Sequence, residues 1–311
     1  MSVIPQFHDR NSCPLCSSCD LGEHLTLDVI RIVICHTCGF IFARDILSAS
    51  EMNQFYNDSY GNQRHMNGQR INATVNTRVL RSFCPDLAER SLLDLGSGYG
   101  FLLNNMRSYG TRVAGVELSQ VERSFSVEQL NIPTFDSMDS LSADEQFDVV
   151  TAFEVIEHIP NPRDFIRCAC EHLKVGGSLI IGTDNFASSV VKKLGRQFPK
   201  WIPHEHISFF TPKTLRLLLE MTGVLAFAGG KSFTPWELLL RQLIFCATFG
   251  SKGGLTYHYP IESTITNHLC YRFFPVRLVM NHIWFNLFHR TDLDGEMMFV
   301  HMIKTHEGSL L

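Results

Sequence analysis

The stretch Ser91–Gly100, SLLDLGSGYG, constrains the fold more than any other part of the chain. It joins a short apolar segment to three glycines, and a helical pattern follows in residues 101–110. Glycines at such a turn permit positive backbone dihedrals and let a ligand approach main-chain atoms. An ordinary strand-to-helix turn can look the same, so the meaning of the loop depends on the residues after it.

Strand-like and helix-like segments alternate from residue 91 to about residue 230. The expected strands are 91–95, 112–118, 147–153, 178–183 and 224–230, and the expected helices are 101–110, 119–131, 162–173 and 212–223. A further strand is expected at 296–304. This alternation predicts an α/β fold with a doubly wound, mostly parallel sheet and helices on both faces.

The chain divides into five expected units. They are a cysteine-rich start at 1–45, a partly helical cover at 46–90, a ligand-binding core at 91–231, an apolar helical insertion at 232–290, and the last core strand with its tail at 291–311. Apolar residues make up 45% of the 311 residues and charged residues 19%, which is enough to build a sizeable core.

Composition also limits the classes of partner. The formal net charge is −4, so no global electrostatic attraction to nucleic acid is expected. The N-terminus lacks the pattern of a secretory signal, and no long uncharged apolar stretch predicts a membrane-spanning helix. A cytoplasmic location is expected, and the oligomeric state stays open.

Five of the ten cysteines lie in the first forty residues. Cys13 and Cys16 form one Cys-x-x-Cys pair, and Cys35 and Cys38 form another, a spacing that predicts a tetrahedral structural Zn²⁺ site. Four protein ligands leave no open position, so we expect this ribbon to brace a wall of the substrate site rather than to catalyse. A redox pair or free thiols are the alternative.

Glu117 ends the second expected strand, where an acidic residue accepts hydrogen bonds from ribose hydroxyls. The loop is spaced G-x-G-x-G, and Phe101 stands where a dinucleotide loop has Gly or Ala. Asp94 would repel a pyrophosphate but suits a positively charged ligand. S-adenosylmethionine carries a sulfonium and an ammonium and no phosphate, so it is the expected cofactor.

These segments resemble the class I S-adenosylmethionine-dependent methyltransferases. The resemblance rests on LLDLGSGYG with Glu117, FDVVTAFEVIEHIPNP, LKVGGSLII and HISFFTPKTLRLLLEMTG, in the order of the family. It implies a seven-stranded Rossmann-like sheet, a methionine site at the glycines, a ribose site at Glu117 and an adenine site at 137–139. Cofactor contacts are expected at Asp94, Gly96, Ser97, Gly98, Glu117, Leu118, Met138, Asp139, Phe153, Glu154 and His158.

A cysteine ribbon followed by CGFIF, FYNDSY and this core also resembles the deoxysugar C-methyltransferases. Those enzymes carry a further C-terminal domain for which this chain has no room, so the resemblance supports methyl transfer more firmly than sugar C-methylation. It implies a base in the sequence His204-Glu205-His206, with Glu205 and His206 as the first candidates. Histidine suits proton removal near neutral pH, and a neighbouring carboxylate can fix its tautomer.

Alternatives stay open at several of these positions. His206 could instead cap the helix that begins near Thr211, or pack under Phe209. Tyr60 could close over the active site or be a packed aromatic residue. Glu154, Glu157 and His158 resemble the acid–acid–histidine set with which ubiquinone-type O-methyltransferases can hold a divalent cation, or they form an ordinary strand-to-helix turn.

Residues 236–290 contain two segments that are apolar on more than one face at helical spacing. They predict a helical lid or a dimer interface, or a patch that lies on a membrane surface with arginines at the headgroups.

The sequence thus predicts a methyltransferase acting on a small or carrier-linked acceptor, such as a sugar or a secondary metabolite, at oxygen or carbon. A non-catalytic binding module and an RNA methyltransferase guided by the ribbon are the alternatives. The intact glycines and Glu117 disfavour the module, and the lack of a basic stripe disfavours RNA.

Overall fold

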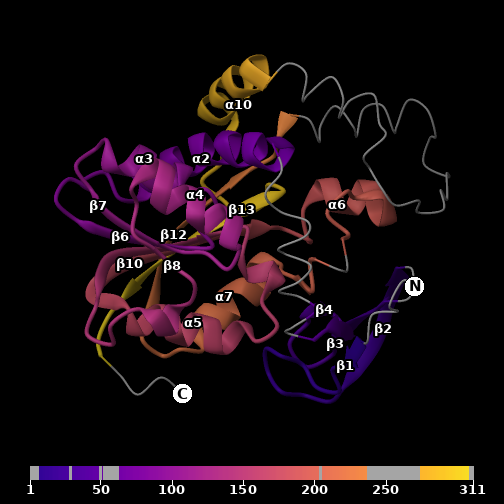
Figure 1. Ribbon diagram of the computed structural model, residues 1–311. Coiled ribbons are helices and arrows are strands. Elements are labelled where there is room, and N and C mark those ends of the chain that lie inside the picture. The colour runs from indigo at the N-terminus through magenta and orange to yellow at the C-terminus, as the bar shows by residue number, and fades with distance from the viewer. Residues whose placement is uncertain are drawn as a thin grey trace, which may run out of the picture.

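A computed structural model describes residues 7–27, 30–48, 51, 63–202, 205–236 and 274–307. Its centre is a seven-stranded sheet with the order β12-β13-β10-β9-β6-β7-β8 (Figure 1). The strands are β6 (Ser91–Leu95), β7 (Arg112–Val116), β8 (Thr134–Phe135), β9 (Phe147–Phe153), β10 (Leu173–Asp184), β12 (Leu225–Phe233) and β13 (Met297–Lys304). β13 runs antiparallel to β10 and β12, and the other pairs are parallel. The predicted doubly wound, mostly parallel sheet is confirmed.

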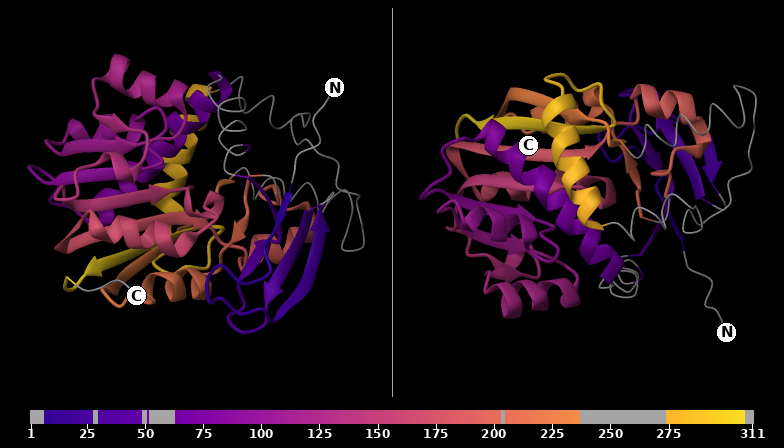
Figure 2. Two further views of the ribbon diagram at one scale, coloured as in Figure 1. Left: turned by 60° about the horizontal axis from the view of Figure 1, so that its bottom comes forward. Right: turned by 90° about the horizontal axis from the view of Figure 1, so that it is seen from above.

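Helices cover both faces of this sheet (Figure 1). They are α2 (Gln63–Phe83), α3 (Phe101–Arg107), α4 (Gln120–Leu130), α5 (Pro162–Glu171), α7 (Pro212–Glu220) and α10 (Phe274–Phe288). A further helix, α6 (Ser189–Leu194), packs against the ribbon strands, and short 3₁₀ turns lie at η1 (Met138–Ser140), η2 (Ile156–His158) and η3 (Gly195–Gln197). Apolar residues of α2, α3 and α10 form one core with the sheet, and those of α5 and α7 form another on its opposite face. In the view from above, α10 runs alongside α2 (Figure 2).

The N-terminal segment forms a smaller sheet beside the core (Figure 2). β2 (Leu21–Leu27), β3 (Ile30–Cys35) and β4 (Ile41–Ala43) are joined by β11 (Ser208–Phe209), so the order is β11-β4-β3-β2. β1 (Phe7–Asp9) pairs with β5 (Asp45–Leu47). Because β11 comes from the segment between β10 and α7, the ribbon sheet is completed by a strand from the α/β core.

Several element boundaries differ from the sequence predictions. The helix expected at 162–173 ends at Glu171, because Leu173 already pairs with Phe147 in β10. β12 extends to Phe233, so the expected insertion at 232–290 begins inside a core strand. Most of that insertion lies outside the described residues. No helix of the described part is both long and apolar enough to cross a membrane.

Candidate functional site

The glycine loop joins β6 to α3 and is tied to the end of β7. The main-chain nitrogens of Gly96 and Ser97 donate to the carbonyl of Val116, at 2.8 and 3.0 Å. Gly96 has a φ of +71°, and a Cβ there would overlap the Cγ2 atom of Val155. The loop can therefore approach the strand ends closely only because this position lacks a side chain.

Glu117 lies directly beside this loop. Its carboxylate accepts hydrogen bonds from the main-chain nitrogens of Gly98 at 2.8 Å and Ser119 at 2.7 Å. Burial, followed by the charge of Glu122, raises the pKa of Glu117 to about 7. These contacts hold the carboxylate at the mouth of the glycine turn.

Asp94 is a second buried carboxyl group at the same end of the sheet. Burial raises its pKa to about 7, the charge of Glu117 adds to the rise, and a hydrogen bond from Thr151 at 2.7 Å opposes it. Two carboxyl groups that are costly to ionise together favour a cationic ligand, because a nearby positive charge stabilises both ionised forms.

A cavity of about 950 Å³ lies over the loop and the strand ends. All eleven predicted cofactor contacts line it: Asp94, Gly96, Ser97, Gly98, Glu117, Leu118, Met138, Asp139, Phe153, Glu154 and His158. Glu205 and His206 line it as well. His204 and Tyr60 lie outside the described residues. The volume is at the upper end of the range for small-molecule sites, which leaves room for a cofactor and an acceptor together.

Helix α2 supplies polar lining residues that the sequence analysis missed. The amide oxygen of Gln69 accepts a hydrogen bond from the main-chain nitrogen of Tyr99 at 2.9 Å, and its nitrogen donates to Glu122 at 3.0 Å. Asn72 donates to Glu154 at 2.6 Å, and His65 lies 3.1 Å from Glu122. Residues 65, 69 and 72 share a helix face, and this spacing was the available signal.

A partly buried ion-pair network forms the other end of the cavity. Lys200, also missed, lies 3.0 Å from a carboxylate oxygen of Glu154 and 3.5 Å from one of Asp184. Burial alone would raise the pKa of Glu154, but the charge and hydrogen bond of Lys200, together with His158 and His65, outweigh burial, and this pKa is lowered. Glu154 itself has a φ of +56°, a strained conformation of the kind found at functional sites.

His206 is buried beside this network. Its Nδ1 atom lies 3.7 Å from Oδ2 of Asp184, and its ring packs edge-on against that of His158 with centroids 4.8 Å apart. Burial, then the charges of His158 and Lys200, lowers its pKa well below the usual value, so His206 is neutral at neutral pH. The carboxylate at its side is Asp184, and not the adjacent Glu205 that the sequence suggested.

The alternative in which His206 caps the next helix is wrong. Thr211 is the N-cap of α7, because its hydroxyl accepts a hydrogen bond from the main-chain nitrogen of Thr214 at 3.2 Å. Glu205 contributes through its backbone: its carbonyl oxygen lies 2.9 Å from Nδ1 of His158. Since a carbonyl can only accept, that contact places the hydrogen of His158 on Nδ1 and leaves Nε2 as the acceptor.

The acid–acid–histidine set is divided in the structure. Glu154 faces Lys200 and Asn72, whereas ligand atoms of Glu157, His158 and His206 lie within 4.8 Å of one another. Burial and the charge of Asp184 raise the pKa of Glu157 to about 8, and one of its oxygens has no hydrogen-bond partner. A divalent cation at this place could be bound by Glu157 and His158 but not by Glu154, so only two of the three expected metal ligands lie together.

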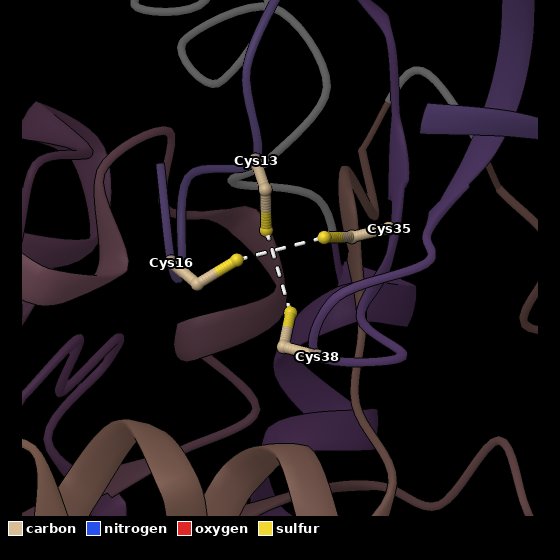
Figure 3. Close-up of side chains that lie close together, drawn as sticks. All are labelled: Cys13, Cys16, Cys35 and Cys38. Carbon is tan, nitrogen blue, oxygen red and sulfur yellow. Dashed lines mark hydrogen bonds between the residues drawn. The ribbon is translucent and has the colours of Figure 1, made fainter. Parts of the chain in front are cut away.

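The four ribbon cysteines converge from two loops (Figure 3). The sulfur atoms of Cys13 and Cys38 are 3.6 Å apart, and those of Cys16 and Cys35 are 3.5 Å apart. A tetrahedral site with Zn–S bonds of about 2.3 Å has S–S edges of about 3.8 Å. The four thiols therefore match the geometry of a structural zinc site.

Comparison with known proteins agrees with this site. Residues 64–224 match the family described as "Methyltransferase domain". A "Ubiquinone biosynthesis O-methyltransferase" from Xanthomonas euvesicatoria pv. vesicatoria is 33% identical over 169 residues, covering 49% of this chain and 70% of that protein. The protein of the same name from Pseudoalteromonas translucida is 29% identical over 167 residues, covering 48% of this chain and 70% of that protein.

Solved structures share the fold at low sequence identity. An S-adenosylmethionine-dependent methyltransferase from Thermotoga maritima aligns with a TM-score of 0.51 and 15% identity, covering 83% of this chain and 100% of that one. Phosphoethanolamine N-methyltransferase 2 of Haemonchus contortus, in complex with S-adenosyl-L-methionine, aligns with a TM-score of 0.52 and 16% identity, covering 86% and 63%. With its sheet, its glycine loop and a family match over just over half of its length, this chain belongs to the methyltransferase domain family and is an S-adenosylmethionine-dependent methyltransferase.

Proposed function

We propose that the enzyme methylates a hydroxyl oxygen of a small acceptor and that His206 removes the hydroxyl proton. The observation that carries this proposal is a buried, neutral His206 that lines the same cavity as Asp94 and Glu117 and has its Nδ1 atom 3.7 Å from Oδ2 of Asp184. Relatives named as O-methyltransferases favour oxygen over carbon as the methylated atom.

The roles of the cofactor residues follow from the cavity. Glu117 would accept hydrogen bonds from the ribose hydroxyls, the turn at Gly96, Ser97 and Gly98 would leave space for the methionine part, and Asp94 would face its positive charges. Leu118, Met138 and Asp139 would border the adenine. The bound cofactor supplies a methyl group on a sulfonium, which is already an activated leaving group.

The acceptor end would work by positioning and proton removal. Asp184 would hold Nδ1 of His206, so that Nε2 takes the proton of the acceptor hydroxyl while the oxygen gains the methyl group. Lys200 stabilises the ionised form of Glu154 and lies 3.5 Å from Asp184, and this contact would orient Asp184 beside His206. Glu205, His204 and Tyr60 remain proposed neighbours of the acceptor.

Substitution of His206 tests the assignment. His206→Gln and Asp184→Asn are compared with His172→Gln, a matched control, because His172 is also buried but lies outside the cavity. S-adenosylhomocysteine release is measured with a panel of sugar nucleotides, phenols and carrier-linked hydroxy acids, and calorimetry measures cofactor binding. Loss of a proton acceptor lowers turnover by about 10² to 10⁴. Normal turnover by His206→Gln with intact cofactor binding would refute the role.

The acceptor is proposed to be free or carrier-linked, with a sugar or a secondary metabolite as the first class to examine. A surface feature supports a lipid-linked carrier: α10 exposes Val276, Val279, Met280, Ile283, Leu287 and Phe288. Such an apolar helix face can lie on a bilayer surface. Flotation with anionic liposomes tests this, and a protein that stays wholly in the soluble fraction argues against membrane contact.

A zinc ion is proposed for Cys13, Cys16, Cys35 and Cys38. In that site it would have a structural role, because four thiolates fill its tetrahedral coordination. The convergence of the four sulfur atoms is the observation that supports it.

A further inference from the structure

The segment after His206 is held by the ribbon. Ser208 and Phe209 pair with Phe42 and Ile41 of β4, and the main-chain nitrogen of Ala43 donates to the carbonyl of Ile207 at 3.0 Å. Ile207, the residue next to His206, is therefore hydrogen bonded to β4 and directly precedes β11, the one described strand of the ribbon sheet that does not come from the cysteine ribbon.

The same residue is also tied to the turn that carries His158. The main-chain nitrogen of Ile207 donates to the carbonyl of Glu157 at 2.9 Å. Ile207 thus stands between the ribbon on one side and the Glu157–His158 turn on the other. Any shift of the ribbon relative to that turn would move the backbone next to His206.

One side chain connects all three segments. The guanidinium of Arg10 donates to the carbonyl of Ala43 in β4, to that of Ile207 at 2.9 Å, and to that of Pro160 at 3.4 Å. Its main-chain nitrogen donates to the carbonyl of Arg44 at 2.8 Å, and its charged end lies 4.9 Å from the ring centre of Phe42. Pro160 lies two residues after His158.

We propose that Arg10 is a positioning residue that fixes the backbone around His206 to the backbone after His158, and so couples the ribbon to the acceptor end of the active site. Arginine is suited to this task because its planar fork presents five donors in a rigid arrangement, whereas lysine offers a single point charge. Burial lowers the pKa of Arg10 to about 10, which still leaves it charged at neutral pH.

The ribbon determines where Arg10 stands. Arg10 lies three positions before Cys13, whose sulfur atom meets that of Cys38 at 3.6 Å. Cofactor binding should depend little on this coupling, because the glycine loop and Glu117 belong to β6, β7 and their turns. Loss of the Arg10 contacts should therefore loosen the acceptor end of the cavity and leave the cofactor end unchanged.

Hydrogen exchange measured by mass spectrometry tests the coupling in the full chain. Arg10→Ala is compared with Arg10→Lys and with Arg44→Ala. Arg44 is a matched control, because it is a ribbon arginine whose side chain contacts Asp9 and Asn11 and does not reach the core. Cofactor affinity and zinc content are measured on each variant.

In Arg10→Ala, amides of segments 156–161 and 205–210 should exchange about tenfold faster, since a charge-assisted hydrogen-bond anchor is lost. Segment 91–107 should keep its protection, and the dissociation constant of S-adenosylmethionine should stay within about twofold. Arg10→Lys should fall between Arg10→Ala and the wild type, and Arg44→Ala should match the wild type. Unchanged exchange at 156–161 and 205–210 in Arg10→Ala would overturn the proposal.

If Arg10→Ala does not fold, Arg10→Lys decides the question, because it keeps the charge but loses the fork. Faster exchange at the two segments supports the coupling, and wild-type exchange overturns it. The catalytic meaning of the coupling rests on the proposed role of His206. With an acceptor from the panel, Arg10→Ala should lower kcat and leave the KM for S-adenosylmethionine unchanged. If His206→Gln keeps full turnover while Arg10→Ala still loosens 205–210, the base assignment fails and the positioning role stands.

Discussion

Substitution of Gly96 by alanine, compared with the same substitution at Gly176, separates the stability cost of backbone strain from the cost of a steric clash. Gly96 has a φ of +71°, and Gly176, in β10 and away from the cavity, has a φ of +77°. Alanine at either position carries the penalty of the left-handed region, about 1 kcal/mol. A Cβ at Gly176 would meet nothing within 4 Å, whereas a Cβ at Gly96 would overlap Cγ2 of Val155 well inside the 3.0 Å limit of real contacts.

The magnitude depends on how far Val155 can adjust. Its branched side chain has few alternative rotamers, so relief of the overlap requires the backbone next to Glu154 to move. Overpacking of this kind costs about 1–3 kcal/mol. Gly96→Ala should therefore lose about 2–4 kcal/mol of unfolding free energy in total, and Gly176→Ala about 1 kcal/mol.

Two measurements check this prediction. Denaturant unfolding gives the two stability losses, and calorimetry gives the affinity for S-adenosylmethionine. Gly96→Ala should bind the cofactor at least about tenfold more weakly, because about 1.4 kcal/mol of lost contact corresponds to that factor. Gly176→Ala should bind it like the wild type. Equal stability losses together with wild-type affinity in Gly96→Ala would refute the close-approach argument.

Three further predictions concern charge and metal. The purified chain should contain about one zinc per molecule, and Cys38→Ser should lose it, as elemental analysis would show; a wild-type chain free of zinc after zinc-supplemented expression would contradict the ribbon assignment. The pKa values of Asp94 and Glu117 are raised to about 7, and a cationic ligand favours their ionised forms, so cofactor affinity should fall by about tenfold as the pH drops from 8 to 6. Calorimetry in buffers of different ionisation heat should detect proton release on binding, and an affinity that does not change with pH would contradict the prediction. Lys200→Met should lose about 3 kcal/mol of unfolding free energy, since the buried Asp184 and the half-buried Glu154 are left without their cation, and Glu154→Gln should restore part of the loss in the double variant; full stability of Lys200→Met would show that the network is not structurally important.

The core of the fold could be predicted because its signals are local. The strand at Phe147–Phe153 has the predicted bounds, as its apolar run is flanked by a clear break on each side. The helix predicted at 162–173 ends two residues earlier, at Glu171, because Leu173 is already part of β10, and the start of that strand depends on its pairing with β9. β11 could not be predicted, because two residues gain strand geometry only by pairing with β4, far away in the sequence.

In the candidate site, too, residues placed by local sequence could be predicted, and residues placed by contacts between distant segments could not. The glycine loop and Glu117 could be found because one strand–turn–helix unit and the next strand place them together. Lys200 and Asp184 could not, since their pairing depends on a loop that folds back over the ends of β9 and β10. The polar residues of α2 that line the cavity could not be predicted, because the sequence indicates only a partly helical cover at 46–90 and not which side of the helix faces a cavity.

Calorimetric titration of the wild-type chain with S-adenosylmethionine, S-adenosylhomocysteine and NAD⁺ tests the central claim most directly. The account predicts that the first two bind with one site per chain, that Glu117→Gln weakens both by about tenfold or more through the loss of a charged acceptor, and that NAD⁺ does not bind. Binding of NAD⁺ without binding of S-adenosylmethionine, or cofactor affinity indifferent to Glu117→Gln, would contradict it.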